Sequence, residues 1–489
     1  MLLENNEKAP RTTAAKLNHD EAILARLGYK QEFRRVFTPI EVFGVGFSII
    51  GLLPSMALRD LTVAFDAGYV RSSVLVYSIP NGGAAAMVWG WGLCAVFLVI
   101  IGLAMAELGS AAPTSGGLYY WTFMFSSPKW RCLLSWIVGY SNTVGNIASV
   151  ASVDWGLAVQ IMAAASIGSD MAFSATVGQT LLCLVIIIGV PAATPNEFRN
   201  SAAYAFGDFQ NCAFDSTVHI SEEATNADVA IPYAIILAAS SSGILGWAIN
   251  VALTFCMGKD LEGILGSPIG QPMATILFNS FGQRGTLAFW AWIIIVQWLY
   301  NVNSRTHAPV YCVWFAAGIS LLLGLLAFAG ANAIGAIFSL VVTGQYLAYS
   351  IPITARFVGK KEIKRGPFSL GRLSLPVAAT AVTWMAFIIV VFLFPANPAP
   401  DSTNMNYTIV VLGHDFHFVS NNAGLTRSLG GTLCLAVVYY YFPVYGGVHW
   451  FKGPVQTIGD IDVASQDSGS EVKGESDSGH NVHEEKRSS

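Results

Sequence analysis

Long apolar stretches, separated by short polar connections, occupy most of the chain. A helix of about 20 apolar residues is long enough to cross the hydrocarbon core of a bilayer. Of the ten stretches given below, the third (132–166) is long enough for a strongly tilted helix, and the sixth (286–300) is short for a full span. The pattern predicts an all-α polytopic membrane protein. Ten stretches approach or exceed the spanning length, at about 39–58, 84–106, 132–166, 174–193, 230–257, 286–300, 309–329, 331–355, 374–395 and 429–447.

Polar tails flank this apolar region. Residues 1–38 contain seven Lys or Arg and five Asp or Glu, and they lack the apolar core of a signal peptide near the start. Residues 453–489 contain eight acidic residues, three Lys or Arg and many serines, which is a composition typical of disorder. The sequence therefore predicts a cytosolic N-terminal tail over 1–38, a transmembrane domain over 39–452 and a disordered cytosolic C-terminal tail over 453–489.

The distribution of Lys and Arg predicts the orientation, because cytoplasmic connections of membrane proteins are enriched in both residues. We expect the regions richest in these residues, and with them both termini, to be cytoplasmic. The loop 396–428, which holds a glycosylation sequon at Asn406, is then expected outside. The cations lie in the N-terminal tail and after the eighth apolar stretch, at Arg26, Lys30, Arg34, Arg35, Arg356, Lys360, Lys361, Lys364, Arg365 and Arg372.

Charged residues make up 11% of the chain and hydrophobic residues 54%. A soluble domain carries roughly 25% charged residues, so a soluble enzyme is excluded and the lipid bilayer is the expected surrounding. The net charge of −4 offers no basic excess for binding nucleic acid. Seven cysteines without a CxxC pair, and His414 and His417 without a third ligand, support neither a disulfide framework nor a metal site. We expect no cofactor and no enzymatic activity.

Two interruptions of the apolar pattern lie at corresponding places in the two halves of the chain. The first is Gly51-Leu52-Leu53-Pro54-Ser55, and the second covers residues 212–217. Irregular backbone survives inside a membrane where it is buried in protein or lines a watery cavity. The ends of the broken helices then attract a carboxylate or an ammonium group. The pattern favours the substrate site of an inverted-repeat transporter, and a simple packing kink at the first interruption is the alternative.

Polar residues inside the apolar stretches are the next signal. Asn142, Asn146 and Asp154 are four and eight residues apart, which places them on one side of a helix. An intramembrane carboxylate is costly and indicates function, so Asp154 is a candidate for proton coupling, with a structural hydrogen bond to another helix as the alternative. A polar stripe in the eighth stretch fits cavity lining and interhelical hydrogen bonding equally well. It consists of Thr343, Gln345, Tyr346 and Tyr349.

A specific pattern follows the second apolar stretch. At residues 107–121 the sequence ELGSAAPTSGGLYYW resembles the amino acid–polyamine–organocation superfamily of transporters, and it is similar to the fungal branch of GABA, amino acid and choline permeases. Together the matching blocks reach from about residue 25 to 455. They include FSIIGLLPSMA from Phe47, VLVYSIPNG from Val74, FDSTVHISEEATN from Phe214, SPIGQPMATILFNSFG from Ser267 and YYFPVYGGVHW from Tyr440.

The resemblance implies twelve helices, ten of which form two inverted five-helix repeats with helices one and six broken at the substrate site. About ten spans are complete in this chain. Freed amides near Gly51 would bind a substrate carboxylate, and carbonyls of the sixth helix would bind its amine. The implied substrate-binding residues belong to the first break, follow the second break or lie on the third helix. They are Ile50, Gly51, Leu52, Leu53, Ser55, Phe214, Asp215, Ser216, Tyr140 and Asn142.

The resemblance also implies a function. It implies secondary active transport, by alternating access, of amino acids, GABA-like zwitterions or choline-like cations across the plasma or vacuolar membrane, with protons as the usual driving ion. Choline lacks a carboxylate and would need an aromatic cage, for which Phe214 and Tyr140 are candidate walls. The candidate proton carriers, without rank, are Asp154, Glu107, Glu222 and Glu223. For the last three, the alternative is that they serve as anchors at the cytoplasmic end.

The chain departs from the family pattern in five places. Residues 58–73 and 414–428 are atypical inserts. Segments of the family's helices four, six and eight are missing between Thr180 and Leu181, between Asn211 and Cys212, and after about Trp298. These departures leave two alternatives to an active transporter. One is a non-transporting nutrient receptor or regulatory relative, and the other is a defective splice or gene-model variant, which sequencing of the transcript across the five junctions would test.

Overall fold

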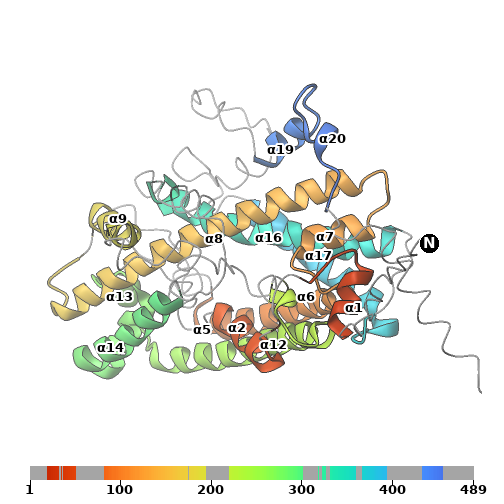
Figure 1. Cartoon of the computed structure of the whole chain (residues 1–489). Coiled ribbons are helices and arrows are strands. Elements are labelled where there is room, and N and C mark those ends of the chain that lie inside the picture. Colours follow the sequence, from red (N-terminus) through yellow and green to blue (C-terminus); the bar gives the residue numbers. More distant parts are fainter. Residues whose placement is uncertain are drawn as a thin grey trace, which may run out of the picture. The chain divides into compact units, whose positions relative to one another are not determined.

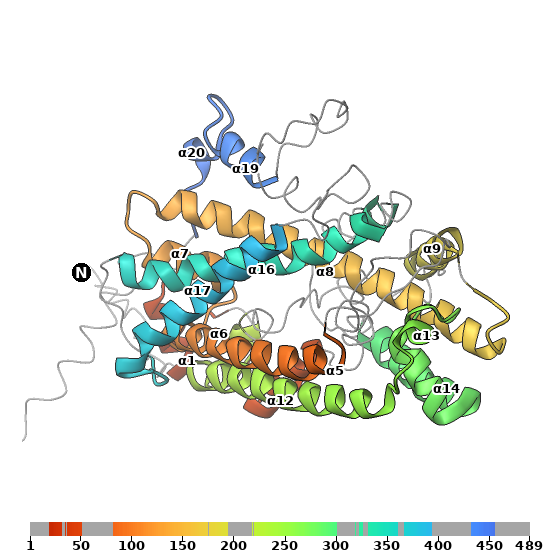
Figure 2. The same ribbon diagram turned by 180° about the vertical axis from the view of Figure 1, so that it is seen from behind.

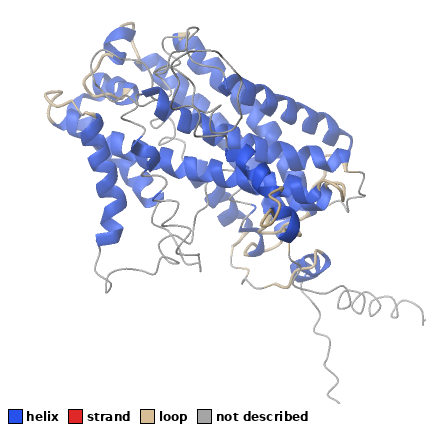
Figure 3. Ribbon diagram, turned by 90° about the horizontal axis from the view of Figure 1, so that it is seen from above, coloured by secondary structure: helices blue, strands red, loops and turns tan. Residues whose placement is uncertain are grey.

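A computed structural model describes residues 19–31, 35, 37–50, 82–174, 176–193, 218, 220–300, 318, 322–325, 331–359, 366–393 and 432–454. Over these residues the regular structure is mainly helical (Figure 3), and an isolated parallel bridge joins Phe37 and Ala224. The chain divides into two units, one of residues 1–34 and 455–489 and the other of residues 35–454. The first unit contains helix α1 (His19–Arg26), and the second contains all other described elements.

The helices of the larger unit follow the apolar pattern of the sequence. Each predicted stretch contains one of them, except 309–329, which lies almost entirely outside the described residues. The longer helices are α2 (Pro39–Ile50), α6 (Trp91–Ala111), α7 (Gly117–Phe125), α8 (Arg131–Gly168), α9 (Val177–Ala193), α12 (Ala227–Cys256), α14 (Pro272–Tyr300), α16 (Ala331–Val358), α17 (Ser374–Leu393) and α19 (Thr432–Tyr440). The short ones are α5 (Gly83–Ala85), η1 (Ala86–Gly90), η2 (Ile220–Glu222), α13 (Leu261–Leu265), η4 (Gly371–Leu373) and α20 (Gly447–Trp450).

Four helical segments among the described residues are long and apolar enough to cross a membrane: Gly83–Ala111, Arg131–Gly168, Ala227–Cys256 and Gly371–Phe392. At 1.5 Å per residue, the 38 residues of α8 extend over about 57 Å. The hydrocarbon core is only about 30 Å thick. Helix α8 must therefore tilt strongly or project beyond the hydrocarbon, in line with the expectation for the third apolar stretch.

Helices α6 and α12 lie side by side and run in opposite directions (Figures 1 and 2). At one end the Trp91 indole N–H donates to the carbonyl oxygen of Gly243 at 3.2 Å. A Cβ atom added to Gly246 would lie 2.3 Å from the nearest atom of the Trp91 ring, so the ring rests directly on the glycine backbone. Small residues allow helix backbones to approach in this way where the surroundings are apolar.

Helix α8 joins two groups of helices. Its first half packs against α7, α16 and α19, and its second half packs against α9 and α14 (Figure 2). The Gln283 amide donates to the carbonyl oxygens of Ile167 and Gly168 at 3.0 and 3.1 Å. The indole of the fully buried Trp290 donates to the carbonyl oxygen of Gln160 at 3.1 Å. These contacts fix α14 antiparallel to the end of α8.

Helix α14 consists of two segments that meet at Gly282, whose backbone has φ 66° and ψ −178°. This conformation is essentially confined to glycine. The break explains why the sixth apolar stretch, at 286–300, looked short, since the helical residues before Gly282 form a separate segment. The family departure after Trp298 lies within α14, and the one between Thr180 and Leu181 lies within the continuous helix α9. The other three departures lie outside the described residues.

Candidate functional site

The residues predicted at the two helix breaks fall largely outside the described part of the chain. Ile50 is the last residue of α2. Gly51, Leu52, Leu53 and Ser55 follow it and are outside the described residues, as are Phe214, Asp215 and Ser216 of the second break. The role of these residues in binding a substrate therefore stays a prediction. The described candidates are Tyr140, Asn142 and Asp154, all on α8.

Tyr140 and Asn142 lie on different sides of α8, because two residues correspond to about 200° of rotation on a helix. The Tyr140 ring is 5.1 Å from the ring of Trp136, measured between centroids. Trp136 in turn donates from its indole to the carbonyl oxygen of Ala436 on α19 at 2.9 Å. Tyr140 thus belongs to an aromatic cluster at the contact between α8 and α19, and the structure does not bring it together with Asn142.

The side of α8 that carries Asn146 faces α16, and the two backbones approach closely. The Ser141 hydroxyl donates to the carbonyl oxygen of Gly344 at 2.7 Å. A Cβ atom added to Gly344 would lie 3.2 Å from Cα of Gly145. The Gln345 amide Nε2 donates to Asn146 Oδ1 at 2.7 Å. The Nε2 group of Gln345 thus makes an interhelical hydrogen bond, one of the two interpretations of the polar stripe, and cavity lining stays a prediction for its Oε1 atom.

Two amide oxygens beside this contact have no donor. Gln345 is only 4% exposed, and among the described residues neither its Oε1 nor the buried Oδ1 of Asn142 has a hydrogen-bond partner. Asn142 lies one helical turn before Asn146, so its side chain is within about 5–6 Å of the residue that binds Gln345. Leaving a buried amide oxygen unpaired costs about 1–3 kcal/mol. The arrangement thus offers two buried acceptors to a ligand that carries N–H groups.

Asp154 lies two turns beyond Asn146 on α8 and is partly buried. In the described part of the chain, no side chain forms a hydrogen bond or an ion pair with its carboxylate. Trp155, which follows it, is buried in the contact between α8 and α9. No structural partner among the described residues accounts for the carboxylate, and proton coupling stays a prediction for Asp154.

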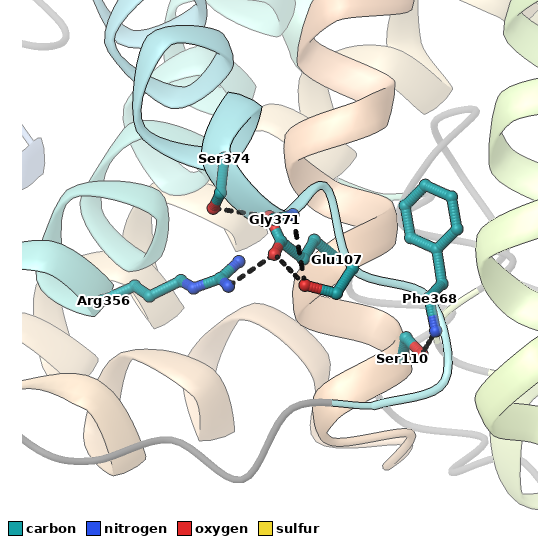
Figure 4. Close-up of polar contacts among 7 residues, drawn as sticks. Glu107, Ser110, Arg356, Phe368, Gly371 and Ser374 are labelled. Carbon is teal, nitrogen blue, oxygen red and sulfur yellow. Dashed lines mark hydrogen bonds and ion pairs between the residues drawn. The ribbon is translucent and has the colours of Figure 1, made fainter.

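Glu107 lies at the centre of a polar cluster that joins three elements (Figure 4). Its Oε1 accepts from Nη2 of Arg356, in the last turn of α16, at 2.7 Å. The Ser374 hydroxyl, at the start of α17, donates to Oε2 at 2.7 Å, and the Ser369 hydroxyl donates to Oε1 at 3.2 Å. The side chains of Glu107 and Arg356 are 4% and 12% exposed. Charges buried to this extent must be paired and hydrogen-bonded.

One turn further along α6, Ser110 bonds the segment that connects α16 to α17. Its hydroxyl donates to the carbonyl oxygen of Asp228 at 2.7 Å. It also accepts from the backbone N–H of Phe368 at 3.0 Å (Figure 4). A Cβ atom added to Gly366 would lie 2.2 Å from the carbonyl oxygen of Ser110. Glycine is therefore required for the connection between α16 and α17 to lie against the end of α6.

Hydrogen bonds also join the segment before α7 and the segment before α2 to residues 221–222. The hydroxyl and the backbone N–H of Ser115 donate to Glu222 Oε1 at 2.6 and 3.0 Å. Arg35 donates to the carbonyl oxygen of Ser221 at 3.1 Å. Glu107 and Glu222 thus serve as anchors between segments, which was the alternative to a role in proton transfer. The sequence showed opposite charges at the ends of predicted spans, but it did not show that Glu107 and Arg356 pair.

Comparisons with known proteins identify a family and several relatives of this chain. The family model described as amino acid permease matches residues 40–194, 202–300 and 292–414. An uncharacterized amino-acid permease of Schizosaccharomyces pombe is 30% identical over 523 residues, covering 90% of this chain and 89% of the relative. A GABA-specific permease of Saccharomyces cerevisiae is 31% identical over 487 residues, covering 81% and 82%. Amino-acid permease 2 of Neurospora crassa is 27% identical over 530 residues, covering 91% and 90%.

These matches cover most of the chain and confirm the resemblance seen at residues 107–121. They also agree with the long apolar helices, which are what a multi-pass membrane protein requires. The chain therefore belongs to the amino acid permease family of the amino acid–polyamine–organocation superfamily and is an integral, multi-pass membrane protein.

Proposed function

We propose that this chain is a secondary active transporter that carries small zwitterions with a primary ammonium group, such as amino acids or GABA, across a membrane by alternating access. Family membership supports transport, and the relative named as a GABA-specific permease supports a GABA-like substrate. The observation that carries the proposal is the pair of buried acceptors, Asn142 Oδ1 and Gln345 Oε1, inside an apolar helix bundle. A primary ammonium group has N–H donors for both oxygens.

Choline is a weaker candidate on the same grounds. Its trimethylammonium group has no N–H, so its single hydroxyl could pair at most one of the two amide oxygens, and the cationic group would need aromatic walls instead. Tyr140, one of the two aromatic residues suggested for such a cage, packs against Trp136 in the contact between α8 and α19. The geometry of the described residues therefore favours substrates that donate hydrogen bonds.

Alternating access is supported by the polar cluster around Glu107. It joins the end of α6 to the ends of α16 and α17, and the positive-inside pattern predicts that this end is cytoplasmic. We infer that these bonds close the cytoplasmic side while the substrate site faces outward. Opening inward would then require α6 to separate from Arg356. Asp154, without a structural partner among the described residues, is the proposed proton carrier.

Uptake by cells that express the full chain with a fluorescent tag tests the proposal. We expect saturable uptake of labelled GABA or neutral amino acids that a protonophore abolishes. Asn142→Leu and Gln345→Met should each raise KM about 10- to 100-fold, since each removes an acceptor for a charged donor. Thr354→Val is the matched control, because Thr354 is exposed on α16 and bonds only its own helix at Ser350.

Other outcomes would contradict specific parts of the proposal. Uptake of choline in preference to GABA would refute the role of the amide acceptors. Accumulation that survives both the protonophore and Asp154→Asn would refute proton coupling through this residue. A chain that reaches the membrane but transports none of the substrates would favour the non-transporting relative or the defective splice or gene-model variant.

A further inference from the structure

A cationic surface lies where the turn between α7 and α8 meets the segment that follows α20. Phe451 packs against Tyr119 and Trp136, with ring centroids 6.2 and 5.2 Å apart. A Cβ atom added to Gly453 would lie 2.1 Å from the nearest atom of the Phe123 ring, so the backbone at Gly453 lies against that ring. Segments about 320 residues apart in sequence are thereby held together at one place.

Three cations lie on the two segments that form this contact. The Arg131 guanidinium lies 4.5 Å from the centroid of the Phe123 ring. Lys129 Nζ lies 5.4 Å from the centroid of the Trp130 ring, and Lys452 immediately precedes the glycine that touches Phe123. Lys129 and Lys452 are exposed. We call Lys129, Arg131 and Lys452 the cationic patch.

The segments that build the patch contain no compensating carboxylate. The chain has no Asp or Glu between residues 108 and 153 and none between residues 416 and 459. Cations on a protein surface are usually interspersed with acidic residues, and only 11% of this chain is charged at all. Among the described residues, no carboxylate forms an ion pair with Lys129, Arg131 or Lys452, and we infer that their charge attracts an anion from outside the chain.

Exposed aromatic rings accompany these charges. Trp130 is 48% exposed, Trp450 is 56% exposed and Tyr445 is 73% exposed. The Trp450 indole donates to the carbonyl oxygen of Tyr445 at 3.1 Å, which fixes the two residues beside one another. Trp and Tyr prefer the boundary between hydrocarbon and headgroups, where one end of the ring is apolar and the other is wet. Cations beside such rings lie at the depth of lipid phosphates.

We propose that the cationic patch binds the headgroup of an anionic phospholipid, with Trp130 and Trp450 against the adjoining acyl chains. Each Lys or Arg near an anionic surface contributes about fivefold in affinity, so three contribute on the order of 100-fold over a neutral lipid. Both the charge complementarity and the interfacial aromatic residues favour a lipid over a soluble anion. This site is separate from the proposed transport site, and it does not depend on transport activity.

The test uses the purified full chain in a neutral detergent, with brominated phosphatidylserine and brominated phosphatidylcholine as probes. Bromine quenches tryptophan fluorescence at short range, so the quenching curves give the preference for the anionic lipid. We expect a preference for phosphatidylserine of tens-fold or more in the unmodified chain. The triple variant Lys129→Gln, Arg131→Gln, Lys452→Gln should lose at least 10-fold of it.

Two further variants make the test specific. The variant Lys259→Gln, Arg284→Gln removes two exposed cations outside the cationic patch, one just after α12 and one in α14. The preference for phosphatidylserine should survive in this variant. The charge-conserving variant Lys129→Arg, Arg131→Lys, Lys452→Arg should also retain it. An unchanged preference in the glutamine triple variant would overturn the proposal, and so would an equal loss in the Lys259 and Arg284 variant. Displacement of phosphatidylserine by equimolar glycerophosphoserine would overturn it too, because the site would then bind a soluble anion.

Discussion

Removing one partner of the pair between Glu107 and Arg356 is expected to destabilise the protein strongly. Glu107→Ala leaves the guanidinium of Arg356 unpaired at 12% exposure and removes the acceptor of the Ser369 and Ser374 hydroxyls. Breaking a buried pair in this way costs about 3–5 kcal/mol, because the remaining charge has neither its partner nor water. Arg356→Ala should cost less, since the Glu107 carboxylate keeps both serine donors.

The double variant separates the pair from its surroundings. Replacing both residues by Ala leaves a cavity and removes the acceptor of the Ser369 and Ser374 hydroxyls, but it leaves no unpaired buried charge. We therefore expect the double variant to be more stable than Glu107→Ala alone. The interaction free energy from the double-mutant cycle should be at least about 2 kcal/mol.

The measurement is reversible unfolding of the purified chain in mixed micelles, titrated with a denaturing detergent and followed by fluorescence. All four members of the cycle are compared under one condition, so that the free-energy differences refer to the same unfolded state. If the two single changes add to the double change within about 0.5 kcal/mol, the pair carries no coupling. That result would refute the view that Glu107 holds α6, α16 and α17 together.

Three other substitutions test separate contacts, each by the midpoint of thermal unfolding in detergent. Gly344→Ala places a Cβ atom 3.2 Å from Cα of Gly145 and should cost about 1–3 kcal/mol through overpacking, whereas an unchanged midpoint would mean that the helices separate freely. Trp121→Phe removes the indole N–H that donates to the buried carbonyl of Ala112 at 2.8 Å, and a loss of about 1–3 kcal/mol is expected. Gly282→Ala forces a side chain into a glycine conformation in α14 at about 1–3 kcal/mol, and a stabilised variant would contradict the break there.

The hydropathy pattern predicted most of the long helices, although α7 (Gly117–Phe125) lies outside the ten predicted stretches. Each apolar residue contributes its own transfer free energy, so burial along a helix can be summed from the sequence without knowledge of its neighbours. For that reason the predicted stretches at 84–106, 132–166 and 230–257 each contain a long helix close to the expected bounds. The pattern could not reveal the break in α14, because the sign of φ at Gly282 depends on the packing on both sides of the turn.

The family could also be recognised from the sequence, since the segment at 107–121 has a specific order of residues. The same segment did not show what its first residue does. Glu107 was one of several candidate proton carriers, and only the folded chain places it against Arg356, 249 residues away. The sequence likewise did not show that Gln345 bonds Asn146, which lies 199 residues away on another helix.

Local propensity and hydropathy thus determined which segments of this protein are helical and which can lie in a membrane. The tertiary structure alone decided which polar groups meet and which stay unpaired. The physical reason is that a pairing such as that of Gln345 with Asn146, or the lack of a donor for Asn142 among the described residues, is a property of two surfaces. Its free energy depends on distance, orientation and exclusion of water, and the chain fixes these only when distant helices pack together.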